Sequence, residues 1–320
     1  MSKHRHRRKY EIGSFLKETF LKEAFYSLSH TTQSNKARKR VNFSKLVDCE
    51  SFRKCSGSLP MMLGTDIDGQ PFIADLTEMS HLCVGAVDTG DKRVCLNTIL
   101  LSFLSRLHPK DLRLLLIDSK RNELADYADL PHLVHPVITE MTEAPNALHW
   151  AILEMDRRYE LMHRLPSRDI SQYNQKLAAY GSELPSDLAD LQHLPYLVIV
   201  SSELEDMRRS SREIETKIVW LTRLGRGAGI LVRLATQHAD IKVFTRTIKD
   251  KFRWYISCIG EGDMLIKKDW SGHVQPVQAP SLSDDEVQAV VAHWRNSGID
   301  ISGLNQPTLL ADSVSKLTSG

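Results

Sequence analysis

Residues 81–94, HLCVGAVDTGDKRV, hold the arrangement of side chains with the clearest chemical meaning. An apolar stretch leads into a turn of small residues, then a lysine, and then a second apolar stretch. A turn of this kind between a strand and a helix binds phosphate, because its backbone N–H groups and the lysine ammonium point at the anion. The sequence therefore predicts a phosphate-binding loop made of Ala86, Val87, Asp88, Thr89, Gly90, Asp91, Lys92 and Arg93.

The charges of this loop conflict with the usual chemistry of such a site. The pattern GxxxxGK[ST] has a glycine before the lysine and a hydroxyl residue after it, which binds Mg²⁺. Asp91 and Arg93 take those places here, and Asp88 adds a second carboxylate. Each like-charge contact costs about 4 kcal/mol at roughly 4 Å, whereas a micromolar affinity is about 8 kcal/mol in total. We therefore expect nucleotide binding to be disabled; alternatively, the segment merely begins a helix and has no ligand.

Composition places the chain among soluble globular proteins. Of its 320 residues, 42% are hydrophobic and 26% charged, which is close to the average. No apolar run reaches the roughly 18 residues of a membrane helix, so we expect no membrane span. The five cysteines show neither metal-ligand spacing nor a disulfide framework. They predict reduced thiols, no metal site and a cytoplasmic location.

The first part of the chain is a basic arm. Residues 1–40 hold 11 of the 42 Lys and Arg residues and only 3 of the 40 Asp and Glu residues. This asymmetry predicts contact with nucleic acid or an anionic membrane surface, and a solvated tail is the alternative. Apolar residues in 11–28 recur near helical spacing, which predicts an amphipathic helix within the arm.

Apolar segments of two lengths alternate along the rest of the chain, which predicts an α/β fold. Short apolar runs predict strands at 72–76, 81–86, 112–118, 195–203 and 230–237. Longer periodic runs predict helices at 94–107, with its apolar residues on one face, and at 143–165. Residues 214–229 predict a helix closed by a Gly-rich turn, and 284–298 predict a late helix that ends before Gly298. We divide the chain into the arm at 1–40, a domain at 41–300 and a tail at 301–320.

Several longer blocks occur in one order and cover residues 41–297. They are LGTDIDGQPFIADLTEMSHLCVGA, LRLLLIDSKRNELADYADLPHL, NALHWAILEMDRRYELM, RDISQYNQK, PYLVIVSSELEDM, RGAGILVRLATQ and GEGDMLI. This set resembles the motor domain of the FtsK/SpoIIIE DNA translocases. The resemblance implies a RecA-like P-loop domain with a mostly parallel central sheet flanked by helices. It also implies a ring of subunits that surrounds double-stranded DNA and pumps it by hydrolysing ATP.

The resemblance implies roles for residues outside the loop. Glu203 matches the glutamate that polarises water, but Ser202 stands where the family has the aspartate that organises Mg²⁺, and a hydroxyl is a weaker magnesium partner than a carboxylate. Arg226 matches an arginine that reaches a neighbouring subunit's nucleotide, and Gln237 matches a sensor residue. Each has a simpler alternative. Glu203 could be an ordinary acid at a strand end, Arg226 could pair with acids of its own subunit, and the Gln237 amide could satisfy buried backbone groups. Residues that could face DNA are Lys120, Arg121, Arg164 and Arg168.

A gap adds to these departures, because a stretch of family residues with an arginine is missing between RWYISCI and GEGDML. We therefore expect a family member that is deficient in ATP hydrolysis, uses no cofactor, and acts as a DNA-binding, ring or scaffold subunit. Its partners would be double-stranded DNA and either copies of itself or an active translocase. The alternative is an active enzyme that uses ATP and Mg²⁺, with Asp118 or Glu205 organising the metal. A remnant without a present role is a third possibility.

Overall fold

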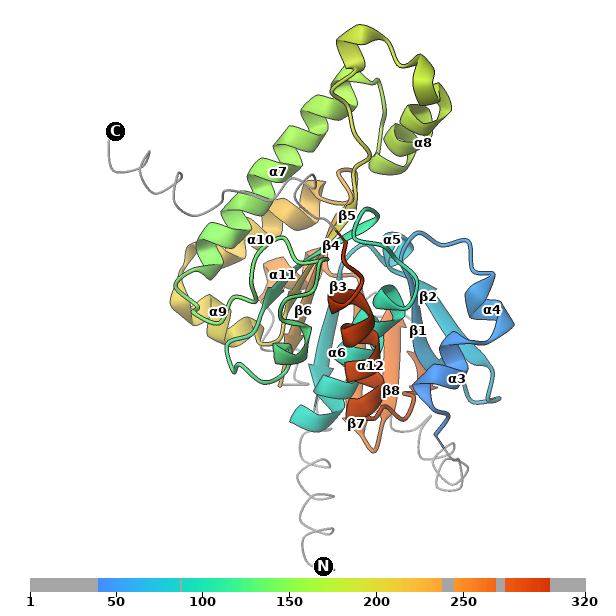
Figure 1. The fold of residues 1–320 in the computed structure, drawn as a ribbon. Helices are drawn as coiled ribbons and strands as arrows, with labels where there is room; N and C mark the ends of the chain where they lie inside the picture. Colours follow the sequence, from blue (N-terminus) through green and yellow to red (C-terminus); the bar gives the residue numbers. More distant parts are fainter. Residues whose placement is uncertain (1–39, 87, 238–244, 269–273, 300–320) are drawn as a thin grey trace, which may run out of the picture.

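The computed structural model describes residues 40–86, 88–237, 245–268 and 274–299, and a mixed β-sheet forms the centre of this part of the chain (Figure 1). The described strands form one nine-stranded sheet in the order β2-β1-β9-β8-β7-β3-β6-β5-β4. Their bounds are β1 Pro60–Thr65, β2 Pro71–Asp75, β3 Leu82–Ala86, β4 Leu112–Ile117, β5 Tyr196–Ser201, β6 Ile230–Thr236, β7 Trp254–Gly260, β8 Asp263–Lys268 and β9 Val274–Gln278.

The sheet has a parallel half and an antiparallel half. Strands β7, β3, β6, β5 and β4 run parallel to one another, and β8, β9, β1 and β2 continue the sheet with antiparallel pairs. The strands predicted at 81–86, 112–118, 195–203 and 230–237 are confirmed as the interior and one edge of the parallel half. Because these strands are parallel, their carboxyl ends meet at one edge of the sheet, where ligands bind in open α/β folds.

Helices cover both faces of the sheet, as predicted (Figure 1). Helices α6 and α12 pack on one face, and α7, α9, α10 and α11 pack on the other. The described α-helices are α3 Phe43–Val47, α4 Glu50–Arg53, α5 Leu76–Met79, α6 Thr89–Leu104, α7 Ala144–Arg164, α8 Ile170–Tyr180, α9 Leu204–Ser210, α10 Glu213–Leu224, α11 Arg246–Lys251 and α12 Asp284–Arg295. Three short 3₁₀ helices lie at Ala125–Tyr127, Gly181–Glu183 and Ser186–Leu188.

Helix α6 is buried on almost every side, so the prediction that its apolar residues occupy one face was wrong. Its side chains from Cys95 to Leu104 are all buried. The antiparallel half of the sheet curls over the helix, and the N–H of Met62 in β1 donates to Ser102 Oγ of α6 at 3.0 Å. A helix enclosed in this way has no solvent face and tolerates apolar residues all round.

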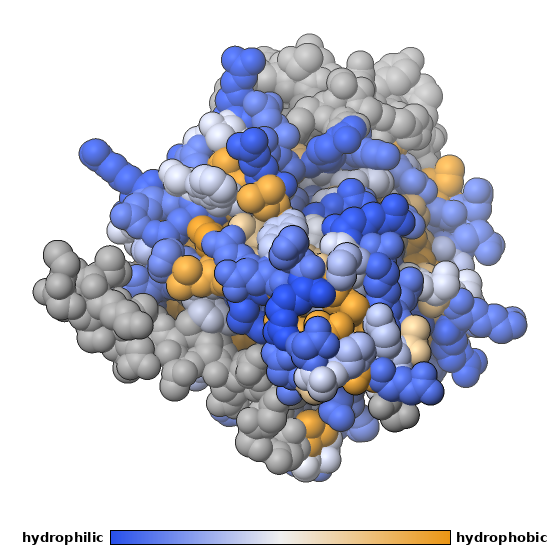
Figure 2. All heavy atoms as spheres, turned by 90° about the horizontal axis from the view of Figure 1, so that it is seen from above, coloured by the Kyte–Doolittle hydropathy of each residue, from blue (hydrophilic) through white to orange (hydrophobic). Residues whose placement is uncertain are grey.

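The face of the described residues drawn in Figure 2 is mostly hydrophilic. In the view of Figure 2, apolar side chains form small separate groups among hydrophilic ones. Of the helices in the described ranges, none is both long and apolar enough for a membrane crossing. The amphipathic helix predicted in the arm and the tail at 301–320 lie outside the described residues, and the division at residues 40 and 300 stays a prediction.

Gly64 makes the curl of the sheet possible. Its φ of +141° is a conformation that L side chains rarely adopt, and the pairing register of β1 with β2 shifts between Met62 and Gly64. A Cβ atom on Gly64 would lie 1.9 Å from the carbonyl oxygen of Gln278, next to the point where β1 meets β9. Glycine is therefore required both by the backbone conformation and by the close approach of the strands.

Gly64→Ala should lower the free energy of unfolding by more than about 2 kcal/mol, because strain and a backbone clash add. Denaturant unfolding measures this loss. The matched control is Gly69→Ala, whose φ is +78° but whose Cβ would meet no atom within 4 Å. That change should cost only about 1 kcal/mol. Equal losses for the two variants would contradict the role of the close approach.

Candidate functional site

The predicted phosphate loop lies at the carboxyl edge of the parallel strands. Strand β3 ends at Ala86 and helix α6 begins at Thr89, while Val87 is outside the described residues. Asp88 is the N-cap of α6, and its Oδ1 accepts a hydrogen bond from the N–H of Asp91 at 2.9 Å. The cap thus satisfies one of the first-turn N–H groups that would otherwise be available to a phosphate.

Asp91 contacts the turn between β7 and β8. Its Oδ1 accepts a hydrogen bond from the N–H of Gly262 at 3.1 Å. Burial raises the pKa of the Asp91 carboxyl, and the negative charge of Asp88 raises it further. A triphosphate at the start of α6 would lie next to both acids, and each of them in its charged form would repel it by about 4 kcal/mol per unit charge at roughly 4 Å.

Lys92 points into the protein, where its side chain is fully buried. Its Nζ donates to the carbonyl oxygen of Ser202 at 2.8 Å and forms ion pairs with Glu123 Oε1 at 3.0 Å and Glu203 Oε2 at 3.4 Å. Both carboxylates are buried as well, with exposed fractions of 1% and 5%. Burial raises the pKa of Glu123, and the ammonium of Lys92 opposes this shift. The lysine is therefore held by acids of its own chain.

Glu203 joins Lys92 to the end of β6. Its Oε2 also accepts the N–H of Gln237 at 3.1 Å, and the Gln237 side-chain amide donates to Thr89 Oγ1 at 3.1 Å. Lys120 Nζ lies 3.9 Å from the same carboxylate. The residues predicted as water-polarising acid, sensor and loop are thus brought together at one edge of the sheet, although no reaction is implied by their contact alone.

Ser202 and Asp118 satisfy each other. Ser202 Oγ donates to Asp118 Oδ1 at 2.8 Å, and Asp118 Oδ2 accepts the N–H groups of Glu123 at 2.9 Å and Leu124 at 2.8 Å. Asp118 is fully buried. Its oxygens therefore organise the loop after β4, which positions Glu123 beside Lys92.

Arg93 occupies the place of the Mg²⁺-binding hydroxyl and is bound to acids of two other segments. Its Nη2 lies 3.1 Å from Asp126 Oδ2 and 3.1 Å from Asp284 Oδ1. Asp284 is the first residue of α12, so Arg93 links α6 to α12. Where the phosphate-loop pattern has a hydroxyl that binds Mg²⁺, this chain has a guanidinium that connects two helices.

These contacts do not fit ATP with Mg²⁺. The ammonium that would bind phosphate is enclosed by acids, and the residue after it is a guanidinium bound to carboxylates. The two acids considered as replacement metal ligands have other partners: Asp118 accepts the bonds described above, and Glu205 pairs with Arg209 at 2.5 Å.

Arg226 lies away from the loop of its own chain. It is exposed and follows α10. Burial lowers the pKa of His81 to about 4, and the charges of Arg233 and, to a smaller extent, Arg226 add to this shift, so Arg226 lies near His81. His81 precedes β3, whereas the phosphate loop follows that strand, so Arg226 is at the opposite edge of the sheet. Any contact with a nucleotide loop would have to be made in another subunit.

The predicted DNA-facing residues do not form one surface. Lys120 and Arg121 follow β4, near Glu203 and Glu140 respectively. Arg164 and Arg168 lie at the far end of α7, toward α8 (Figure 1). Arg164 makes two hydrogen bonds to the carboxylate of Asp190.

One residue of the site was not predicted from the sequence. Glu123 forms the shorter of the two ion pairs of Lys92. An acid five residues after the strand-end Asp118 was a usable signal for it.

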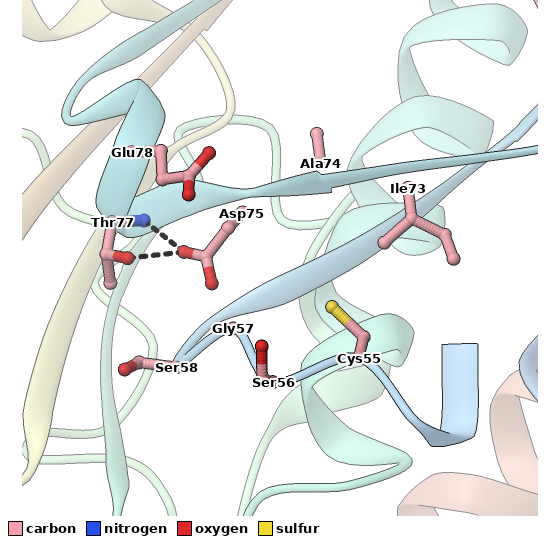
Figure 3. A pocket seen from close by; sticks show the side chains of 9 residues that line it. All are labelled: Cys55, Ser56, Gly57, Ser58, Ile73, Ala74, Asp75, Thr77 and Glu78. Atoms are coloured by element: carbon pink, nitrogen blue, oxygen red, sulfur yellow. Dashed lines mark hydrogen bonds between the residues drawn. The ribbon is translucent and has the colours of Figure 1, made fainter. Parts of the chain in front are cut away.

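A cavity of about 390 Å³ lies elsewhere, between residues 55–58, strand β2 and the start of α5 (Figure 3). Asp75 and Glu78 are the acids in its wall, and Asp75 accepts hydrogen bonds from the N–H of Thr77 at 2.6 Å and from its hydroxyl at 2.5 Å. The N–H of Leu59 lies 3.3 Å from the other Asp75 oxygen. These contacts serve the local turn, so the candidate site remains the loop after β3.

Solved structures with the same fold define the class of protein. The cytoplasmic domain of the Thermomonospora curvata type VII secretion ATPase EccC superposes with a TM-score of 0.63 and 19% identity, covering 80% of this chain and 34% of that one. The pCW3 conjugation coupling protein TcpA, solved as a monomer with ATPgS, gives 0.60 and 20%, covering 74% and 71%. The fold is therefore that of the RecA-like P-loop ATPases.

Sequence comparison then places the chain within this class. Residues 43–240 match the model of the FtsK/SpoIIIE family, and the chain belongs to that family. Proteins named DNA translocase FtsK from Haemophilus ducreyi and Haemophilus influenzae are each 35% identical to it over 82% of its length. The aligned region spans only 31% and 56% of those two relatives.

Lys92→Met should lower the free energy of unfolding by about 3–5 kcal/mol, because it leaves two buried carboxylates without their cation. Denaturant titration measures the loss. The double variant Lys92→Met/Glu123→Gln should lose less than Lys92→Met alone. The control is Lys54→Met, which breaks an exposed pair with Glu50 and should cost under about 0.5 kcal/mol. If Lys92→Met were as stable as the control, the ammonium would not be a structural group.

Proposed function

We propose that this chain is an FtsK/SpoIIIE-family protein that does not hydrolyse ATP and acts as a DNA-binding or ring subunit. One observation carries the proposal: the phosphate-loop lysine is fully buried in ion pairs with Glu123 and Glu203. To bind a triphosphate, Lys92 would have to leave both buried carboxylates. Glu123 would then lose its ion pair, and Glu203 would keep only Lys120, 3.9 Å away. Breaking a buried ion pair costs about 3–5 kcal/mol, a large part of the roughly 8 kcal/mol of a micromolar affinity.

The retained surroundings of the loop support a role in an assembly. The three residues that depart from the family pattern, Asp91, Arg93 and Ser202, each contact a group of their own chain. The fold around the loop is therefore held together although the usual phosphate- and Mg²⁺-binding residues are replaced. Double-stranded DNA is the proposed partner, because relatives at 35% identity are named DNA translocases. A ring made with copies of this chain or with an active translocase would bind that DNA without hydrolysis of ATP by these subunits.

An active translocase is the second candidate function. The placement of Glu203, Gln237 and Thr89 in one hydrogen-bonded group favours it, since an acid and an amide near the loop are what a hydrolase would need. In that case Lys92 would exchange its carboxylates for phosphate when the nucleotide binds.

Isothermal titration calorimetry with ATP and Mg²⁺ separates the two. We expect no binding at submillimolar ATP and no release of phosphate when double-stranded DNA is added. Micromolar binding together with DNA-stimulated phosphate release would refute the proposal. In that event Glu203→Gln should abolish the release while leaving the binding, which would identify Glu203 as the group acting on water.

Deletion of residues 1–40 tests the contribution of the arm to DNA binding. The full chain should bind double-stranded DNA with an affinity that falls steeply with salt, by about 0.9 in log–log slope for each phosphate contact. The deletion should weaken binding and flatten this slope, because it removes 11 basic residues. Fluorescence anisotropy at several salt concentrations gives both quantities, and an unchanged affinity and slope would exclude the arm.

A further inference from the structure

The loop after β3 faces an acidic hairpin. Strands β7 and β8 are joined by a tight turn in which Gly260, Glu261 and Gly262 all have positive φ, at 113°, 55° and 78°. This turn reaches the start of α6, where the Gly262 N–H donates to Asp91. Burial raises the pKa of Asp263, and the charges of Glu261 and Asp91 raise it as well. Asp88, Asp91, Glu261 and Asp263 therefore form one acidic surface, the loop carboxylates.

A guanidinium already lies at this surface. Arg40, the first described residue, packs against Gly262, where an added Cβ would be 2.4 Å from Arg40 Cζ. A side chain at position 262 would displace the guanidinium, and the φ of +78° also favours glycine there. The positive charge of Arg40 acts to lower the pKa of both Asp91 and Asp263, against the effect of their burial. A cation therefore lies beside the loop that binds anions in a working phosphate site.

The chain that follows Arg40 is fixed to the same part of the sheet. The N–H of Phe43 donates to the carbonyl oxygen of Ser281 at 3.0 Å, and the N–H of Ser281 donates to that of Val41 at 2.9 Å. The N–H of Ala279 donates to the carbonyl oxygen of Gly262 at 2.8 Å. These bonds tie the exit of the basic arm to the hairpin that carries two of the loop carboxylates, Glu261 and Asp263.

We propose that the basic segment 36–40 of this chain, KARKR, docks on the loop carboxylates. The segment carries Lys36, Arg38, Lys39 and Arg40, and Arg40 is the member whose place is described. Four cationic side chains then face four carboxylates. The loop has changed from a receptor for phosphate into a receptor for the chain's own guanidinium and ammonium groups.

This docking explains why two acids persist at the start of α6. Neither Asp88 nor Asp91 can help to bind a polyanion, but both attract a basic segment held next to them. Docking also places the segment in competition, because DNA phosphates and the loop carboxylates would bind the same side chains. The inference rests on the proposed function only in that the loop is free of nucleotide.

Limited trypsin digestion of the full chain tests the proposal. The test variant is Asp91→Asn with Asp263→Asn, in which the amide oxygen at 91 can still accept the Gly262 N–H. The matched control is Asp68→Asn with Asp285→Asn, which removes the same charge from exposed acids elsewhere. The initial rate of cleavage after Lys36, Arg38 and Lys39 is followed by mass spectrometry at low salt.

We expect the test variant to be cleaved about fivefold faster than the wild type, and the control at the wild-type rate. Salt at 0.5 M should bring the wild type close to the test variant, because it screens exposed ion pairs. Equal rates in all three proteins, or equal acceleration in the control, would overturn the proposal. If the test variant does not fold, Arg40→Gln replaces it and should accelerate cleavage likewise. Neither variant depends on ATP binding, so this result and the calorimetry are read separately.

Discussion

The buried ammonium of Lys92 is the interaction on which the rest of the structure depends. A charge without water is tolerated only when it is paired and hydrogen-bonded. Lys92 meets this condition through Glu123, Glu203 and the carbonyl oxygen of Ser202. These three acceptors come from the segments after β4 and β5, so one side chain joins helix α6 to the ends of two neighbouring strands. In an active phosphate loop the same side chain would have to remain available to the ligand.

The other departures in the loop fit this arrangement. Asp91 accepts a hydrogen bond from the β7–β8 turn, Arg93 joins α6 to α12, and Ser202 donates to Asp118. Each residue that would disturb a nucleotide has instead a partner within the chain. Agreement of this kind across several contacts is expected of a structure kept by selection and not of a decaying remnant. It supports the proposed role, which depends on the shape of the domain and not on ATP hydrolysis.

Much of the fold could be predicted from the sequence. The parallel strands are continuous apolar runs such as LRLLLI and YLVIVS, which are typical of strands buried on both faces. Because the strands are parallel, their carboxyl ends lie at the same edge of the sheet. That topology also brings Lys92, Glu203 and Gln237 together. The enclosure of α6 could not be predicted, because it depends on β1 curling over the helix through a distant glycine. Glu123 was missed for a similar reason, since only the hydrogen bonds of Asp118 turn that loop toward the lysine.

The scattering of the predicted DNA-facing residues has a physical explanation too. The sequence does not show which acid a basic residue will pair with. In the folded chain Arg164 is hydrogen-bonded to Asp190, and Lys120 lies next to Glu203. Local sequence does not reveal which charges are neutralised by residues far along the chain. The arm shows the same limit: its charge is evident from composition, but only the structure shows that its last residue, Arg40, lies against Gly262 and near Asp91.

A crystal structure of the protein grown with millimolar ATP and Mg²⁺ tests the central claim most directly. The account predicts that Lys92 Nζ stays within hydrogen-bonding distance of Glu123, close to the 3.0 Å found here, and that no triphosphate lies on the amides of residues 88–92. A triphosphate bound there, with Lys92 turned away from Glu123 and Glu203 to contact it, would contradict the account.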